Sequence, residues 1–232
     1  MSKIGIIGAM ELEVKALKEK MQITEVITKA SMEFYAGTLD GIEVVVVQCG
    51  IGKVNAALCA QILADHHEVT HIINTGVAGS LDAALDIGDI LISDCAVYHD
   101  MDVTALGYER GQVPQLDVKA FPADTHLTDL ALRKCTEVNP DIHVMTGCVV
   151  SGDQFVSSKE VKDDILAHFN GKCTEMEGAA IAHGAYLNKI PFVIIRAISD
   201  KADDSAHMDY PTFEKAAAVH SARLVESMLA EI

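Results

Sequence analysis

Three parts of the chain carry carboxylates that could do acid–base chemistry. Glu13 follows a short apolar stretch, on the opening turn of a predicted helix. Glu175 and Glu177 stand two residues apart at the end of a predicted strand, where such residues share a face. Arg196 and Asp200 close a further apolar run. Each feature also has an ordinary explanation, because acids are common at helix starts and Arg196 could simply pair with Asp200.

Glycine-bearing turns follow several of the predicted strands and could bring the backbone close to a ligand. They lie at residues 5–8, 50–53, 76–79 and 150–153. None completes a dinucleotide fingerprint, because Asn55 stands where the third glycine belongs. No Ser or Thr follows Lys53, so the same turn is not a P-loop. NAD and nucleoside triphosphates are therefore disfavoured, and no cofactor is expected.

The elements that must position these residues alternate between two hydrophobic patterns. Runs rich in β-branched residues predict strands at 3–7, 32–39, 42–49, 71–75, 90–97, 144–151, 172–176 and 192–199. Helical periodicity predicts helices at 11–21, 54–66, 127–137, 157–168, 178–188 and 210–229. The alternation predicts one α/β domain over residues 1–232, built as a three-layer α/β/α sandwich. We expect the wholly apolar runs at 44–47 and 192–195 to be central strands.

The predicted topology would gather the carboxylates in one place. In an open α/β sheet, the loops at the carboxyl ends of the strands line a single crevice. We therefore expect residues 9–13, 76–79, 151–156, 175–177 and 196–200 to converge there. Several acidic side chains would then face one ligand.

The composition of the chain limits the kinds of partner that it can bind. The net charge of −16 argues against nucleic acid and anionic membranes, yet it allows an uncharged nucleoside. Six scattered cysteines without a CxxC pair are typical of free thiols in the cytoplasm. The first apolar stretch is too short for a signal peptide, and no run is long enough to cross a membrane. His99, His183 and His207 lack the spacing of metal ligands, so no metal is expected.

The least regular stretch runs from residue 98 to residue 126 and mixes acids with apolar side chains. An excursion of this length is usually functional or disordered, and its apolar residues argue against disorder. We therefore expect it to make a contact between subunits.

The assembled motifs resemble a known family. They are residues 4–10 with Glu13, then 50–54, 74–76, 150–153, 175–177 and 196–200. Their order and spacing are similar to those of the 5′-methylthioadenosine/S-adenosylhomocysteine nucleosidases, and the resemblance covers essentially the whole chain. It implies a nucleoside phosphorylase-like sandwich around a distorted mixed sheet, and a homodimer. It also implies hydrolysis of the N-glycosidic bond of both nucleosides, which releases adenine and a thioribose product for methionine salvage.

The resemblance also implies roles for individual residues. Asp200 would protonate adenine at N7, Glu13 would activate the attacking water, and Glu177 would bind the ribose hydroxyls. A hydrogen bond from Ser199 would orient Asp200. The other implied contacts are the backbone near Gly79, Val156 and Met176, the ring of Phe155 stacked on the purine, Arg196 beside the water, and Val103, Leu106 and Pro114 of the excursion, which would reach the partner's pocket.

The chain departs from the family pattern at one residue, and three alternative functions remain open. Many relatives carry serine where this chain has Val77, so the hydroxyl that would help to hold the water is missing. A nucleoside phosphorylase of the same fold would need cationic or hydroxyl groups to hold phosphate where Glu13 places a negative charge. A nucleosidase for futalosine or a related adenosine is a second alternative. A non-catalytic sensor of adenosine derivatives is the third, although all three carboxylates of the site are retained.

Overall fold

The computed structural model describes residues 2–232, with the exception of the side chains of residues 207, 208, 211 and 214–217. The strands are β1 (Lys3–Gly8), β2 (Gln22–Lys29), β3 (Met32–Leu39), β4 (Ile42–Gln48), β5 (His71–Ser80), β6 (Ile90–Tyr98), β7 (Phe121–Pro122), β8 (Val144–Ser151), β9 (Gly171–Glu175) and β10 (Phe192–Asp200). The helices are α1 (Glu11–Lys20), α2 (Lys53–Asp65), α3 (Thr125–Val138), α4 (Lys159–His168), α5 (Gly178–Asn188) and α6 (Ala206–Met228). Short 3₁₀ turns lie at Thr104–Leu106 and Leu229–Glu231.

All of these strands belong to one mixed sheet, which confirms the predicted sheet type. Along the path β10-β6-β8-β9-β5-β1-β4-β3-β2, each strand pairs with the next. A further parallel pairing joins β10 to β5, so β5, β10, β6, β8 and β9 form a closed circuit. The strands β1, β4, β3 and β2 extend from it as an open arm. The sheet is thus partly closed, unlike the open sheet assumed in the sequence argument.

The closure follows from the length of β5. Its first residues pair with β1 and its last residues, Gly79 and Ser80, pair with β9. Strand β10 pairs with residues 72–79 along the other edge of β5. A strand of ten residues can serve two neighbours in succession along one edge, and its strong twist turns the second neighbour out of the plane of the first. The predicted strand stopped at residue 75 and so missed this second half.

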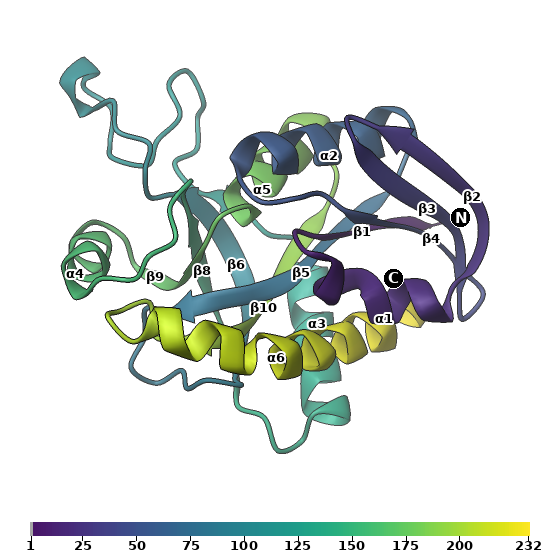
Figure 1. The fold of residues 1–232 in the computed structure, drawn as a ribbon. Helices are drawn as coiled ribbons and strands as arrows, with labels where there is room; N and C mark the ends of the chain where they lie inside the picture. Colours follow the sequence, from purple (N-terminus) through teal and green to yellow (C-terminus); the bar gives the residue numbers. More distant parts are fainter. Residues whose placement is uncertain (1) are drawn as a thin grey trace.

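Helices cover both faces of the sheet, as Figure 1 shows. One hydrophobic core lies between the sheet and helices α2 and α5, with Leu63 and Ile181 among its buried residues. The other core lies between the sheet and helices α1, α3 and α6, and contains Leu17, Leu130 and Leu224. These two cores make the predicted three layers. No helix among the described residues is long and apolar enough to cross a membrane.

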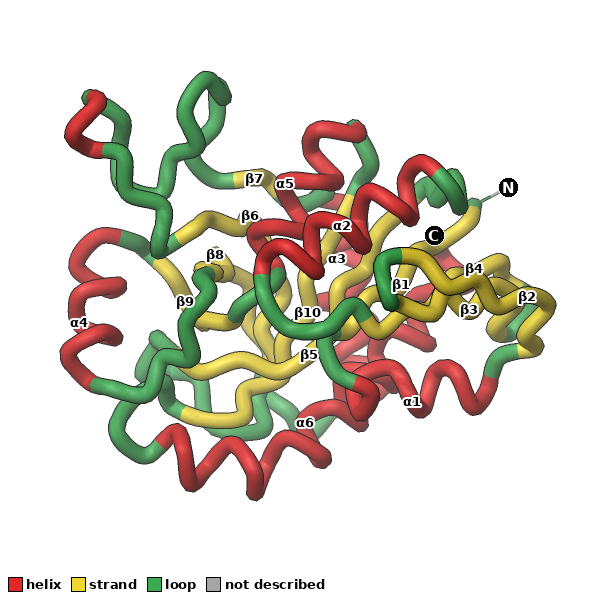
Figure 2. The backbone as a smooth tube through the Cα atoms, turned by 45° about the horizontal axis from the view of Figure 1, so that its top comes forward, coloured by secondary structure: helices red, strands yellow, loops and turns green. Residues whose placement is uncertain are grey.

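Two strands were absent from the sequence prediction. Strand β2 is exposed along almost all of its length, so its sequence lacks the apolar alternation of a half-buried strand. It is held instead by its antiparallel ladder to β3. Strand β7 is only two residues long, and Phe121 anchors it by stacking on His183 with ring centroids 4.6 Å apart. The chain between β6 and β7 projects from the body of the molecule, as Figure 2 shows.

Candidate active site

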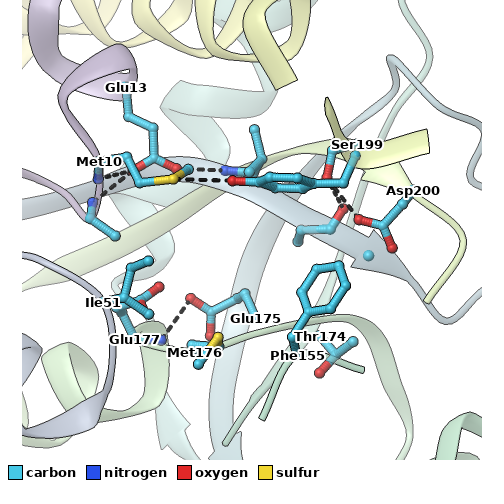
Figure 3. Close-up of a pocket in the computed structure, with 15 residues that line it drawn as sticks. Met10, Glu13, Ile51, Phe155, Thr174, Glu175, Met176, Glu177, Ser199 and Asp200 are labelled. Atoms are coloured by element: carbon cyan, nitrogen blue, oxygen red, sulfur yellow. Dashed lines mark hydrogen bonds between the residues drawn. The ribbon is translucent and has the colours of Figure 1, made fainter. Parts of the chain in front are cut away.

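The carboxyl ends of several strands meet at one cavity of about 340 Å³. Segments that follow β1, β4, β8 and β9 reach it, together with the ends of β5 and β10 and the first turns of α6. Figure 3 shows Glu13 and Asp200 on opposite sides of this space. The lining residues are Ala9, Met10, Glu13, Ile51, Val77, Ala78, Gly79, Phe155, Thr174, Glu175, Met176, Glu177, Ser199, Asp200 and Tyr210.

Glu13 is buried, and three backbone N–H groups hold its carboxylate. One oxygen accepts hydrogen bonds from the backbone of Ala9 at 2.6 Å and Met10 at 2.9 Å. The other oxygen accepts from the backbone of Val77 at 3.1 Å. Burial raises the pKa of Glu13, while the charge of Arg196 and these hydrogen bonds lower it in part. Glu13 is therefore an acidic residue in the first turn of α1. Its second carboxylate oxygen also faces β5.

The residues of β5 beside Glu13 leave little free room. A Cβ atom added at Gly76 would lie 2.5 Å from the Glu13 carboxylate, so only glycine fits there without moving the acid. Val77 contributes its backbone N–H to Glu13, and its apolar side chain lines the cavity. The side chain at position 77 therefore offers no hydroxyl to a water beside Glu13.

Arg196 and Glu175 form a buried ion pair beneath the cavity. The side chains are 2% and 3% exposed, and both the Nε and Nη2 groups of Arg196 donate to Glu175. Arg196 also donates to Asn74 and to the carbonyl of Ile195. The alternative pairing of Arg196 with Asp200 is therefore wrong. Burial alone would lower the pKa of Arg196, but the nearby carboxylates, Glu175 first, raise it.

Glu175 also fixes the start of α5. It accepts hydrogen bonds from the backbone of Gly178 at 2.8 and 3.0 Å and from the backbone of Glu177 at 3.3 Å. The hydroxyl of Ser151, at the end of β8, donates to Glu175 and accepts from the backbone of Ala179. One carboxylate thus ties β8, β10 and α5 together directly below the cavity.

Glu177 lies just before α5 and faces the cavity. The backbone N–H of Gly52 donates to it at 2.8 Å. Burial, followed by the negative charge of Glu175, raises the pKa of Glu177 to about 8. The carboxyl therefore binds its proton more tightly than a solvated glutamate does.

Asp200 ends β10 on the other side of the cavity. The expected hydrogen bond from the Ser199 hydroxyl is present at 2.9 Å, and the backbone of Ala202 donates at 2.8 Å. Burial raises the pKa of Asp200, although these hydrogen bonds lower it in part. A Cβ atom added to Gly79, its register partner on β5, would lie 2.7 Å from the carboxylate. The glycine therefore keeps room for the acid.

Apolar side chains form the rest of the wall. Phe155 is 46% exposed at the mouth and meets the ring of Tyr210 edge to face, with centroids 5.8 Å apart. Val156 lines a smaller adjoining cavity of about 30 Å³, with Phe155 and Met176 in its wall. The hydroxyl of Tyr210 donates to the sulfur of Met10 at 3.0 Å.

Of the nine predicted site residues, eight line one of the two cavities and Arg196 lies behind them, paired with Glu175. The sequence argument missed Ile51, Thr174 and Tyr210. Thr174 directly precedes the Glu-Met-Glu sequence, and Tyr210 opens the helix predicted at 210–229, so proximity in sequence was a usable signal for both. No group of three or more metal-ligating side chains occurs among the described residues, which do not include the side chain of His207.

We predict that Glu175→Gln lowers the free energy of unfolding by about 3–5 kcal/mol, because it removes the carboxylate that pairs with the buried guanidinium of Arg196. Urea denaturation measures the change. The matched control is Asp164→Asn, which breaks the exposed ion pair with Arg110 and should hardly shift the midpoint. Equal shifts in the two variants would contradict the importance of the buried pair.

A second prediction concerns the pH dependence of stability. The Glu177 carboxyl titrates at about 8 in the folded protein and at an ordinary 4.5 when unfolded. The folded state therefore holds an extra proton, and its stability falls as the pH rises from about 5 to about 8. Glu177→Gln should not lose stability in this way. Over that pH range its free energy of unfolding should therefore rise relative to that of the natural chain.

Denaturation at several pH values between these limits measures the difference. A difference between Glu177→Gln and the natural chain that stays constant from about pH 5 to about pH 8 would contradict the raised pKa of Glu177.

Comparisons with known proteins identify the family of this chain. Residues 3–230 match the family model described as the phosphorylase superfamily. The chain is 44% identical over 232 residues to a 5′-methylthioadenosine/S-adenosylhomocysteine nucleosidase of Staphylococcus aureus (strain MRSA252), which covers 99% of this chain and 100% of the relative.

Solved structures of related proteins superimpose closely on this fold. A 5′-methylthioadenosine/S-adenosylhomocysteine nucleosidase from Neisseria meningitidis, in complex with methylthio-immucillin-A, superimposes with a TM-score of 0.96 at 39% identity, covering 100% of both chains. A futalosine hydrolase of Helicobacter pylori (strain 26695) superimposes with a TM-score of 0.94 at 33% identity, covering 100% of this chain and 98% of the other. The chain therefore belongs to the phosphorylase superfamily and, within it, to the family of 5′-methylthioadenosine/S-adenosylhomocysteine nucleosidases.

Proposed function

We propose that this protein hydrolyses the N-glycosidic bond of 5′-methylthioadenosine and S-adenosylhomocysteine, and releases adenine and the 5-thioribose product. The observation that carries the proposal is the position of Glu13 and Asp200 on opposite sides of one cavity, with Glu177 also in its wall. The cavity of about 340 Å³ has the size of a small-molecule site. Membership of the nucleosidase family supports the same substrate class.

Asp200 is the general acid in this proposal. Its raised pKa lets it keep a proton nearer to neutral pH, and Ser199 and the backbone of Ala202 fix its orientation. Proton transfer to N7 of the purine makes the base a better leaving group, so the bond to the sugar can break.

Glu13 is the general base for the attacking water. Its three backbone hydrogen bonds hold the carboxylate in one place, and its raised pKa makes it a stronger proton acceptor. The sugar gains positive charge as its bond to the base breaks, and the acids around it stabilise that charge. Glu177, held by the backbone of Gly52, accepts from the ribose hydroxyls.

The remaining residues bind and position the substrate. Phe155, at the mouth, stacks on the purine, and the backbone near Gly79, Val156 and Met176 completes the contacts. Arg196 lies behind the cavity, where its charge acts on Glu13 beside the water and its pair with Glu175 fixes the turn that carries Glu177. With Val77 in place of a serine, the water relies on Glu13.

The alternative activities fit the site less well. A phosphorylase must bind a phosphate dianion, yet no Lys or Arg is among the described residues that line the main cavity. A non-catalytic sensor has no need of acids with raised pKa on both sides of a ligand. A futalosine-type nucleosidase remains the second candidate, because the hydrolase from Helicobacter pylori shares the fold at 33% identity.

We also infer a homodimer in the cytoplasm that serves methionine salvage. Leu106 is 72% exposed on the projecting segment, where Val103 and Pro114 also lie, and further apolar side chains are exposed on α2 and α5. A second copy that covered them would bring the projecting segment near its partner's pocket. All six cysteines are free, which suits a reducing compartment.

The first functional prediction is that cleavage does not depend on phosphate. Methylthioadenosine should yield free methylthioribose and adenine at the same rate with or without phosphate, because Glu13 repels a phosphate dianion. Product analysis by chromatography and mass spectrometry measures this, and a chelator should leave the rate unchanged. Methylthioribose 1-phosphate as the main product would instead support a phosphorylase.

A further prediction concerns the base. The enzyme should prefer methylthioadenosine to methylthioinosine, because the backbone near Val156 accepts from the exocyclic amine and a 6-oxo group would be left unpaired. The cost of about 1–3 kcal/mol corresponds to roughly 5- to 150-fold in kcat/KM. Asp200→Asn should remove most of this preference and lower kcat by about 10²- to 10⁴-fold, since an amide cannot transfer the proton.

Steady-state kinetics of both substrates, in both proteins, test this point. Equal kcat/KM values in the natural enzyme would mean that the base is not recognised in this way. Near-normal turnover by Asp200→Asn would remove Asp200 from the acid role.

The last prediction of this group concerns the dimer. Leu106→Asp should weaken self-association and activity together, because the new charge would be desolvated at the contact. Val219→Asp introduces the same charge at another exposed apolar position, on α6, and serves as the control. Sedimentation and activity are measured on both variants. A natural protein that sediments as a fully active monomer would refute the proposed dimer.

A further inference from the structure

Two cysteines lie side by side on neighbouring strands, on residues that the proposed reaction does not use. Cys95 on β6 and Cys148 on β8 are register partners in the parallel pair that these strands form. The register shifts between Ser93 and Cys95, so Cys95 rather than Asp94 lies opposite Cys148. Both thiols are free and half-buried. The two strands run next to each other in Figure 1.

The spacing of the pair suits a covalent bond. Paired residues on adjacent strands have Cα atoms about 4.8 Å apart, within the range of about 4.4–6.8 Å that disulfides require. Register partners on neighbouring strands project to the same face of the sheet, and both side chains line the same cavity. The pKa of the Cys95 thiol is raised, first by its hydrogen bond with Cys148 and then by burial. The register pairing on one face of the sheet therefore places the two thiols side by side.

The pair is also accessible. It lines a cavity of about 310 Å³ whose wall includes Lys119, His168 and Lys172. Lys119 is paired with Glu109, and Lys172 is paired with Asp82. The other four cysteines, by contrast, are buried. A small oxidant can therefore reach this pair more readily than the rest.

We propose that Cys95 and Cys148 form a reversible oxidation site, at which a peroxide converts the two thiols into a disulfide that joins β6 to β8. A metal site is the competing interpretation of two adjacent thiols. It is disfavoured because no third ligand completes a metal-binding group among the residues that the structure describes.

The chemistry has two balanced steps. The Cys148 thiolate attacks one oxygen of hydrogen peroxide, which breaks the O–O bond, gives a sulfenic acid and releases hydroxide. Cys95, its register partner, then acts as the resolving thiol. Its sulfur attacks the sulfenic sulfur, the S–O bond breaks, and the thiol proton leaves with the oxygen as water. In total, two thiols lose two electrons and two protons, and one peroxide becomes two waters.

Peptide mapping of the full-length protein tests the proposal. The protein is treated with hydrogen peroxide, its free thiols are alkylated, and it is digested without reduction. We expect a cross-linked peptide that contains Cys95 and Cys148, a protein mass lower by two hydrogen atoms, and reversal of both by dithiothreitol. Two of the six thiols should be lost in a thiol titration under denaturing conditions.

Three variants control the experiment. Cys95→Ser and Cys148→Ser should each lose the cross-link, and the thiol that remains should gain oxygen instead of losing hydrogen. Cys135→Ser removes a buried thiol on α3 and should keep the cross-link. If a variant does not fold, the peptide map of the natural protein is enough to test the proposal. The proposal is overturned if both thiols are alkylated at a peroxide dose that fully oxidises glutathione, or if either one links to another cysteine.

Discussion

The buried ion pair between Arg196 and Glu175 is the interaction on which the rest of the site depends. Four carboxyl groups meet within a small volume, from Glu13, Glu175, Glu177 and Asp200, and each is at most 8% exposed. Arg196 is the one cation that pairs with them among the described residues. Isolated charges are costly to bury, so a group of acids with a single cation tends to hold protons. Burial raises the pKa of each of the other three acids, and their hydrogen bonds offset this only in part.

Backbone N–H groups stabilise the carboxylates that do not pair with Arg196. The turn before α1 donates to Glu13, the turn before α2 donates to Glu177, and the turn after β10 donates to Asp200. These donors are fixed by the strands that precede them, and the closure of the sheet through β5 and β10 brings those strands together. The same arrangement therefore stabilises the acids and orients them. An enzyme that must both donate and accept protons in one cavity benefits from this.

Much of this arrangement could be predicted from sequence, because strong local patterns encode it. The apolar runs of β4 and β10 and the periodic helices were recognisable, and acids at strand ends marked the region of the site. Pairings between distant segments could not be recognised from the sequence. The partner of Arg196 depends on where β9 lies beside β8 and β5, so the sequence could offer only Asp200 as an alternative partner, and the structure pairs Arg196 with Glu175 instead. The adjacency of Cys95 and Cys148 depends on a register shift that no local pattern reveals.

The account is tested most directly by the carboxyl titrations themselves. Carbon-13 NMR of the Asp and Glu side-chain carboxyls, followed from acid to alkaline pH, measures each pKa. The account predicts three carboxyls that titrate above the ordinary range, Glu177 among them at about 8. Each of these signals should be absent from one of the variants Glu13→Gln, Glu177→Gln and Asp200→Asn. Titration of every carboxyl between about pH 3 and 5, as in solvated side chains, would contradict it.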